Sequence, residues 1–186
     1  LEALQIREEV YGVEHNEYAD MQGRLGSLYY EMGDYKKSEE YYQDALDTRF
    51  ELYGKNHKEY ANSLVNLGWY HKNLGNYKKS EEYYLEALSI RKELHGEDHP
   101  KYKSLFTSIG NLYFDKEDYN KAKEYYEQSL KYYLDKYGKR HQYYSSGLIN
   151  MQRVFSKQGD YDKAEKYLLE ALQIREEVYG VEHNEY

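Results

Sequence analysis

Apolar and polar positions along this chain follow the period of an α-helix. Residues 60–71 give the clearest case, because Tyr60, Leu64, Leu67, Gly68 and His71 stand at spacings that fall on one helical face. Short polar pairs interrupt the pattern at 33–34, 75–76, 117–118 and 159–160. We therefore predict pairs of helices joined by tight turns. In the first repeat the first helix runs roughly over residues 16–32 and the second ends at Gly54.

Whole segments of the sequence recur every 42 residues. A histidine, a tyrosine three residues later and a glycine each appear five times at this spacing. They are His15, His57, His99, His141 and His183; Tyr18, Tyr60, Tyr102, Tyr144 and Tyr186; and Gly12, Gly54, Gly96, Gly138 and Gly180. We divide the chain into a half repeat (1–14), four full repeats (15–56, 57–98, 99–140, 141–182) and the start of another (183–186), all within one domain.

Helix ends are also marked in the sequence. The second residue of each polar pair has a short side chain: Asp34, Asn76, Asp118 and Asp160. Such residues favour the N-cap position of a helix, because their side-chain oxygen accepts an unpaired backbone N–H. The recurring glycine suits the position just past the end of the second helix. The single proline, Pro100, follows His99, where a first-turn proline is tolerated. We expect helices to begin and end at these residues.

The chain opens and closes on the same eighteen residues, LEALQIREEVYGVEHNEY, at 1–18 and 169–186. The offset of 168 residues is four periods. Two explanations fit: a four-repeat unit duplicated in tandem in a parent protein, or a chain cut or designed so that its ends match. Because Leu1 falls in the middle of a pattern, we expect a piece of something longer. Uncapped repeats expose apolar surface, and the residues expected to be under-covered are Leu4, Ile6, Val10, Leu172, Ile174 and Val178.

These repeats resemble the tetratricopeptide repeat. In the second repeat the matching residues are Leu67, Gly68, His71, Gly75, Tyr77, Ser80, Tyr84 and Ala87, and the pattern recurs along the chain. The resemblance implies an all-α fold, a right-handed α-solenoid of stacked helix-turn-helix repeats. The period exceeds the usual 34 residues and looks like the longer repeats of kinesin light chains and of bacterial tandem arrays. Glu117 and Gln152 depart from the pattern, standing where a turn glycine and a close-packing glycine are expected.

Composition narrows the functional classes. The 27 tyrosines add bulk to a core, and we expect the pairs at 41–42, 83–84 and 125–126 to place one ring inside and one at the edge. A net charge of −8 without a basic stripe argues against nucleic acid or membrane as the partner. The chain has no cysteine, no visible signal peptide and no apolar run near the ~20 residues of a membrane span. We expect a cytoplasmic protein.

Candidate chemistry is sparse. Equivalent histidines of stacked repeats lie too far apart to share one metal ion, so the histidine column is interpreted as structural. The cluster HGEDH at 95–99 does not match the helical zinc-protease motif and straddles a turn. The sequence also lacks a nucleophile elbow and a phosphate-binding glycine loop. We therefore predict no enzyme activity, no metal and no cofactor.

Recognition is the remaining function. The resemblance implies that the first helix of each repeat lines a concave face that holds a peptide or protein ligand, with an acidic start (Asp20, Glu31) and a basic end (Arg153, Lys157). Trp69, the only tryptophan, is the strongest candidate anchor. The predicted peptide-binding residues are Asn62, Val65, Asn66, Trp69, Lys72, Asn73, Thr107, Asn111, Phe114, Ile149, Arg153 and Lys157. The lysine–asparagine clamp that some members use for a terminal carboxylate is not reproduced.

Two functional hypotheses stand side by side. The first is a scaffold that binds a peptide or protein on its first helices. The second is a structural repeat array that associates with itself, end to end or as a superhelix, through under-covered terminal helices. Substituting Trp69 separates them, because it should remove partner binding in the first case and leave assembly intact in the second.

Overall fold

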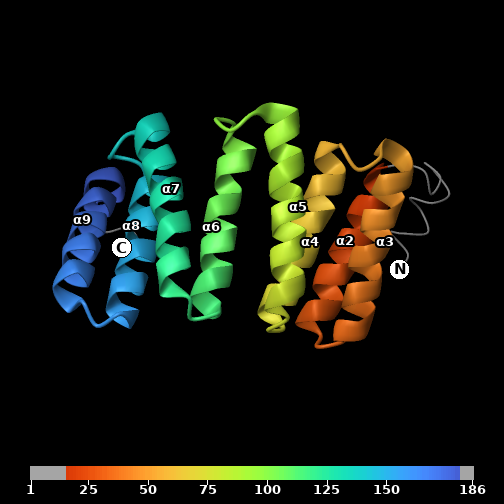
Figure 1. The fold of residues 1–186 in the computed structure, drawn as a ribbon, viewed down its shortest axis with the longest axis horizontal. Helices are drawn as coiled ribbons and strands as arrows, with labels where there is room; N and C mark the ends of the chain where they lie inside the picture. The colour runs from red at the N-terminus through yellow and green to blue at the C-terminus, as the bar shows by residue number, and fades with distance from the viewer. Residues whose placement is uncertain (1–15, 181–186) are drawn as a thin grey trace. The chain divides into compact units, whose positions relative to one another are not determined.

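The computed structural model describes residues 16–180, and every regular element in that range is an α-helix (Figure 1). The helices are α2 (Asn16–Glu31), α3 (Tyr35–Tyr53), α4 (Lys58–Asn73), α5 (Tyr77–His95), α6 (Pro100–Asp115), α7 (Tyr119–Tyr137), α8 (Gln142–Lys157) and α9 (Tyr161–Tyr179). The first helices of the repeats start at residues 16, 58, 100 and 142, each 42 residues after the one before. The predicted bounds of the first helix differ from the observed ones by a single residue.

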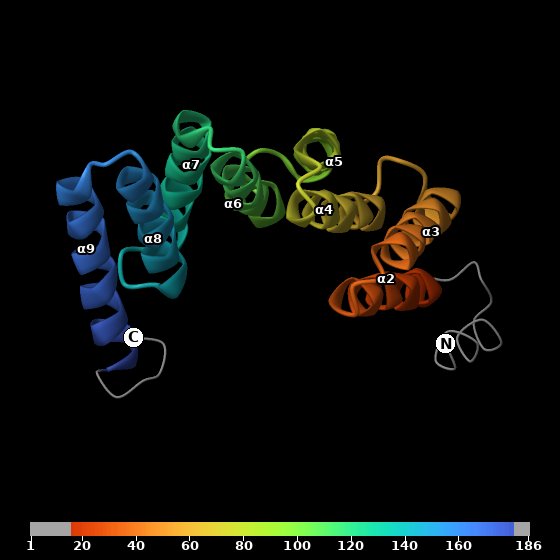
Figure 2. The same cartoon turned by 90° about the horizontal axis from the view of Figure 1, so that it is seen from below.

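The described helices fall into two compact units, with the boundary after Tyr102 in the first turn of α6. In the first unit α2 packs on α3, α3 on α4, and α4 on α5. In the second unit α7 packs on α8, and α8 on α9 (Figure 2). Within each unit, the second helix of one repeat thus lies against the first helix of the next.

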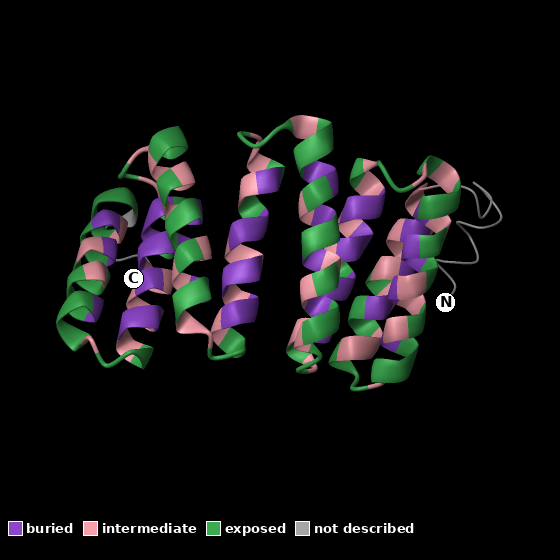
Figure 3. Cartoon of the chain, in the orientation of Figure 1, coloured by how far each residue is buried: buried purple, intermediate pink, exposed green. Residues whose placement is uncertain are grey.

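In the second repeat the first helix contributes more of its length to the core than the second helix does. Eight of the sixteen residues of α4 are buried, compared with five of the nineteen in α5. Figure 3 shows this as buried stripes along α4, α6 and α8. The face predicted from the sequence, with Tyr60, Leu64, Leu67, Gly68 and His71, is buried throughout. Few positions of α4 therefore remain open to a partner.

A glycine of the first helix lets a tyrosine ring of the second helix lie directly against the backbone. The pairs are Gly26–Tyr42, Gly68–Tyr84 and Gly110–Tyr126, where an added Cβ would lie only 2.9, 2.7 and 2.6 Å from the ring. In the fourth repeat, Gln152 replaces the glycine and Leu168 replaces the tyrosine. The repeat that has a side chain at the glycine position thus lacks the ring that would clash with it. The predicted close-packing role of the glycines is confirmed.

The other tyrosine of each pair stacks on an aromatic ring of the first helix. The stacked pairs are Tyr29–Tyr41, His71–Tyr83, Tyr113–Tyr125 and Phe155–Tyr167, with centroids 5.4, 5.5, 5.6 and 5.5 Å apart and planes within 11° of parallel. The inner rings Tyr42, Tyr84 and Tyr126 are buried, and the outer rings are half-buried. This arrangement confirms the prediction of one ring inside and one at the edge.

Most predicted helix caps are present. The carboxylates of Asp34, Asp118 and Asp160 accept the backbone N–H three residues on. Asn76 also stands at the N-cap position, but its side chain does not make the expected hydrogen bond. Glu117 adopts the left-handed backbone conformation of the turn glycines, with φ of 63°. Because a Cβ disfavours this conformation, the third turn carries local strain that the other turns avoid.

The histidine column caps the first helices. The Nδ1 atoms of His57, His99 and His141 each accept the backbone N–H two residues on, at 3.2 Å. Each ring also stacks on the side chain four residues before it, with centroids 4.1–4.5 Å apart. The column is structural at these three repeats; His15 and His183 lie outside the described residues.

The last helix, α9, leaves apolar side chains open to solvent. Leu172 and Val178 are 42% and 41% exposed, as expected for an under-covered helix, and Leu168 and Leu169 are also exposed. Ile174, however, is buried against Tyr144 and Leu148 of α8, so the expectation for this residue was wrong. The fold places Ile174 on the inner side of the helix pair. Leu4, Ile6 and Val10 lie outside the described residues.

Candidate functional site

The predicted binding residues of the first unit form an exposed row on α4. Trp69 is 40% exposed, and Asn66 and Asn73 are exposed one turn before and after it. The Asn73 amide donates to the Trp69 carbonyl at 2.9 Å. Val65 and Lys72 are half-buried beside this row. Trp69 therefore lies between two exposed amide groups on the solvent side of α4.

An aromatic cluster supports Trp69 from the neighbouring repeat. The rings of Trp69 and of Tyr30 on α2 meet in an edge-to-face geometry, with centroids 4.8 Å apart and planes at 61°. Tyr30 in turn contacts Tyr35 at the start of α3, at 5.5 Å and 53°. The Tyr70 hydroxyl donates to the Tyr35 carbonyl at 2.8 Å and ties α4 to α3, while burial raises the Tyr70 pKa to about 12, so the hydroxyl stays protonated. Trp69, Tyr30 and Tyr35 thus sit on a rigid base.

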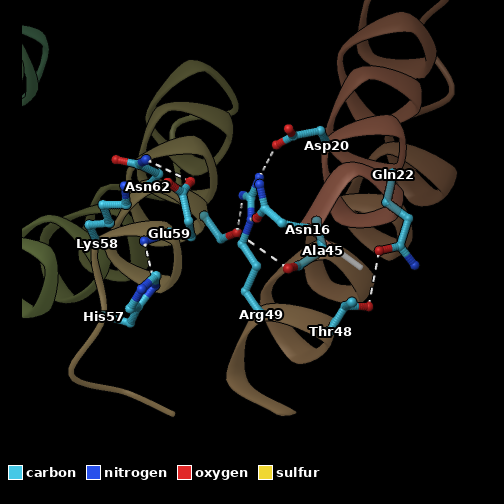
Figure 4. A network of polar contacts seen from close by, with 11 residues as sticks. Asn16, Asp20, Gln22, Ala45, Thr48, Arg49, His57, Lys58, Glu59 and Asn62 are labelled. Carbon is cyan, nitrogen blue, oxygen red and sulfur yellow. Dashed lines mark hydrogen bonds and ion pairs between the residues drawn. The ribbon is translucent and has the colours of Figure 1, made fainter. Parts of the chain in front are cut away.

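A buried arginine joins α3 to the first helices of two repeats. Arg49 is only 4% exposed and ion-pairs with Asp20, donates to Asn16 at 3.2 Å, and donates to Ser63 of α4 at 2.7 Å (Figure 4). Asp20 is therefore engaged by Arg49, although the sequence suggested it as a charge at the start of the binding face. Sequence reasoning missed Arg49. The signal that could have found it is the recurrence of arginine at positions 7, 49, 91 and 175.

At the position of Arg49 in the second repeat, Arg91 binds Asn62, which is one of the predicted binding residues. Arg91 donates to the Asn62 side chain at 3.0 Å and to the Lys101 carbonyl at 2.7 Å. Asn62 also donates to Glu59 at 3.1 Å. Because both ends of its amide are already bound, Asn62 contributes to helix packing, and its place in the binding site remains a prediction.

In the second unit three predicted residues come together. The Arg153 guanidinium lies over the Phe114 ring, 4.2 Å from its centroid, and donates to the Asn111 side chain at 3.5 Å. The Tyr126 hydroxyl also donates to Asn111, at 2.6 Å, and burial raises the pKa of Tyr126. The fold thus brings α6 and α8 together through a cation held on a ring.

The other predicted residues of this unit are divided between core and surface. Thr107 shares a hydrogen bond of 2.7 Å with Ser129 of α7, and Ile149 packs against the cluster around Leu148. Lys157 is exposed at the end of α8. Thr107 and Ile149 therefore serve packing in the fold, while Lys157 is open to solvent.

Three side chains of the HGEDH segment make structural contacts. The His95 and His99 rings stack on each other, and the Glu97 carboxylate pairs with Lys92 at 2.5 Å. Over residues 16–180, no three or more histidine, cysteine or acidic side chains gather where they could hold a metal ion. Within the same range, no helix is both long and apolar enough to cross a membrane.

Stacked helix pairs with an exposed aromatic and amide row define a helical-repeat protein of the α-solenoid class. Two family models described as tetratricopeptide repeat match the sequence, one over residues 1–49, 18–93 and 70–135, and the other over residues 153–185. The chain belongs to the tetratricopeptide repeat family. No curated protein matches its sequence.

Several solved structures share the fold. BtubC (BKLC) from P. vanneervenii is 27% identical, with a TM-score of 0.77 over 90% of this chain and 66% of that one. A putative kinesin light chain of P. anserina with nearly identical TPR-like repeats is 15% identical, with a TM-score of 0.76 over 96% of this chain and 84% of that one. A variant of that fungal protein, in which methionine replaces one glutamine, gives a TM-score of 0.77. These likenesses show that the chain shares the fold of these repeat proteins.

Proposed function

We propose that this chain is a protein-interaction scaffold that binds an extended peptide or protein segment on the first helices of its repeats. Tetratricopeptide repeat proteins are in general such scaffolds. The observation that carries the proposal is the exposure of Trp69, the single tryptophan, on a helix of which half the residues are buried. Tryptophan is enriched among the residues that dominate binding energy at interfaces.

The neighbours of Trp69 suit an extended backbone. Asn66 and Asn73 lie one turn on either side of it, and an asparagine amide can both donate to and accept from a peptide unit. A partner side chain would pack on the indole while its main chain hydrogen-bonds to these amides. The proposal involves no catalytic step, and we infer that the chain is not an enzyme; a cytoplasmic location remains a prediction.

The test is selection of peptides from a random library on the wild-type chain, followed by affinity measurement with two variants. Trp69→Ala should weaken the selected peptides by at least about tenfold, since truncating an interface hot spot costs about 2 kcal/mol or more. Leu85→Ala is the matched control, because Leu85 is 42% exposed on the second helix α5. Equal affinity for the wild-type chain and Trp69→Ala would refute the proposed site.

A second candidate function, association between copies, is favoured by the open face of α9. Residues 169–182 of this helix and its end are identical to residues 1–14, which precede α2 in the sequence. Because the second helix of a repeat packs on the first helix of the next, as α3 does on α4, the face of α9 suits α2 of another copy. Leu168, Leu169 and Leu172 would be covered in such a contact.

Light scattering coupled to gel filtration over a hundredfold range of protein concentration tests this candidate. If copies assemble through α9, the measured mass of the wild-type chain should rise with concentration. The mass of a Leu169→Lys variant should stay at 22.5 kDa. A Leu85→Lys variant places the same charge on α5 and should assemble like the wild-type chain. A constant mass for the wild-type chain would exclude this candidate and leave the peptide scaffold.

A further inference from the structure

The two units carry the same pair of rings at corresponding positions. Tyr30 and Tyr35 have centroids 5.5 Å apart at 53°, and Phe114 and Tyr119, which lie two repeats later, are 5.5 Å apart at 63°. In both cases the first ring is one residue before the end of the first helix of a repeat, and the second ring starts the following helix. The second unit can therefore be used to interpret the first.

In the second unit the first ring of the pair, Phe114, holds a cation from the chain itself. The Arg153 guanidinium lies 4.2 Å from the centroid of Phe114, within the range of a cation–π contact. Two amide oxygens fix its direction, since Arg153 donates to Asn111 at 3.5 Å and to Asn150 at 3.4 Å. The arrangement is a guanidinium site that an internal residue fills.

In the first unit the position of Arg153 is taken by Trp69. The indole meets Tyr30 in an edge-to-face geometry, and 40% of the Trp69 side chain remains exposed. Tyr35 is 46% exposed beside it, and Asn66 stands at the position of Asn150. A tryptophan face attracts a cation more strongly than a tyrosine or phenylalanine face does. Compared with the second unit, the first unit keeps the pair of rings, adds the indole as a third ring and lacks the internal cation.

The local charge agrees with a cationic ligand. The Glu31 carboxylate follows Tyr30 at the end of α2 and is exposed, and the whole chain carries a net charge of −8. Lys72 lies three residues after Trp69, but it is half-buried and already has a partner. The two exposed lysines that follow Tyr35 already form ion pairs, Lys36 with Glu40 at 3.7 Å and Lys37 with Asp34 at 3.2 Å.

We propose that Tyr30, Tyr35 and Trp69 form a site for the guanidinium of an arginine side chain in a peptide partner. The arginine would stack on the indole face near Tyr35, with its N–H groups directed to Asn66 and Glu31. The inference rests on the proposed peptide-binding function and adds the chemistry of the residue that Trp69 recognises.

The test compares two peptide libraries that are identical except at the central position, which is arginine in one and citrulline in the other. Citrulline keeps the shape of arginine and removes its charge. Binders that depend on Trp69 should come from the arginine library, and replacing the arginine of the best binder by citrulline should weaken it about tenfold. Because Trp69 is the only tryptophan, its fluorescence reports occupancy of this site directly.

Variants of the chain supply the matched controls. Trp69→Arg copies the pair seen in the second unit and should abolish binding with helicity and melting temperature unchanged. Arg153→Trp opens the corresponding site of the second unit and should raise the peptide stoichiometry from one to two. Tyr35→Leu should weaken binding, while Tyr161→Leu, at the corresponding place in the fourth repeat, should not.

The outcomes separate this inference from the function on which it rests. Equal recovery of Trp69-dependent binders from both libraries would overturn the arginine site and leave the peptide scaffold standing. Failure to recover any Trp69-dependent binder, from these libraries or from an unbiased one, would overturn both. If Trp69→Arg does not fold, unchanged stoichiometry in Arg153→Trp decides against the inference by itself.

Discussion

Single residues set how closely the helices of a pair approach. Gly68 has no Cβ, and the ring of Tyr84 occupies the space where one would lie. Gly23, by contrast, lies on α2 with only the Asn66 amide about 4.0 Å from such an atom. Two glycines of neighbouring first helices therefore have different roles, although both interrupt a helix in the sequence.

This difference predicts opposite effects of the same substitution. Gly68→Ala should destabilise the chain by about 1–3 kcal/mol, because the new methyl group forces the buried ring aside. Gly23→Ala should stabilise it by roughly 0.5–1 kcal/mol, since alanine has the higher helix propensity. Denaturant unfolding followed by circular dichroism measures both values.

A double variant tests the mechanism. Tyr84→Leu in the Gly68→Ala background reproduces the combination of a side chain at position 152 and Leu168 that the fourth repeat uses. Part of the loss from Gly68→Ala should then be recovered, giving a coupling energy of roughly 1 kcal/mol in a double-mutant cycle. Additive effects of the two changes would mean that the ring contact is not the cause.

Glu117 is a second residue whose backbone decides its effect. Its φ of 63° matches the turn glycines of the other repeats, which have φ between 76° and 79°. Glu117→Gly should raise the free energy of unfolding by about 1 kcal/mol, because glycine adopts this conformation without a steric penalty. Glu124→Gly, on the exposed side of α7, should lower it by about the same amount. Equal signs for the two variants would contradict this explanation.

His71 gives the first unit a dependence on pH. It is 1% exposed, stacked on Tyr83, and its Nε2 lies 3.6 Å from Glu39, which also pairs with Lys79 at 3.3 Å. Burial lowers the His71 pKa below its ordinary value of 6.5, with Glu39 acting in the opposite direction and Lys79 adding to the effect of burial. The unfolded chain therefore binds the proton at a higher pH than the folded chain does.

The sign of the effect follows from proton linkage. Above about pH 6.5 both states have a neutral His71 and its contribution is complete; below this pH the unfolded state gains protons first and stability falls. The loss is at most about 1.4 kcal/mol per pH unit for this one group. His71→Tyr, which copies Tyr29 and Tyr113, should reduce the slope between about pH 6.5 and the lower folded pKa. Identical slopes for both chains would rule out His71 as the source.

Helices are held to their neighbours by a few polar side chains as well as by rings. The guanidinium of Arg49 joins α3 to Asp20 and Asn16 of α2 and to Ser63 of α4. Serine hydroxyls at Ser38 and Ser80 donate to the carbonyls of the close-packing glycines at 2.7 Å. These contacts fix the order of three successive helices, which apolar packing alone would hold less specifically.

Loss of Arg49 should therefore weaken the first unit strongly. Arg49→Met removes the hydrogen-bond donor of the buried Ser63 hydroxyl and the cation that pairs with the Asp20 carboxylate. It should lower the free energy of unfolding by about 2–4 kcal/mol. Arg24→Met, at an exposed position of α2, should change stability by less than about 0.5 kcal/mol. Chemical unfolding of the two variants measures the difference, and similar small losses would show that Arg49 is dispensable for packing.

At the scale of the whole molecule, one pattern is used for several purposes. The repeated glycines, tyrosines and histidines define the helix pairs, and the positions that vary between repeats determine what each pair presents. At one such position the repeats carry Ser27, Trp69, Asn111 and Arg153. This variation on a constant framework explains why the first unit presents an exposed ring site and the second fills its own.

The periodic sequence by itself determined the helix pairs, their turns and most of their caps. These features depend on residues close together in the chain, so a repeat of 42 residues was sufficient to predict them, and the departures at Glu117 and Gln152 were visible as well. Most of the predicted core face was recovered for the same reason, since helical spacing places those residues on one side.

Only the tertiary structure decided which polar residues remain free. Asp20, Asn62 and Thr107 were expected on a binding face, yet Arg49, Arg91 and Ser129 engage them. Tyr35 was not singled out, although it stands beside Trp69 through Tyr30. Each of these contacts joins side chains from different helices, and helical periodicity says on which face a residue lies without saying which residue of the next helix meets it.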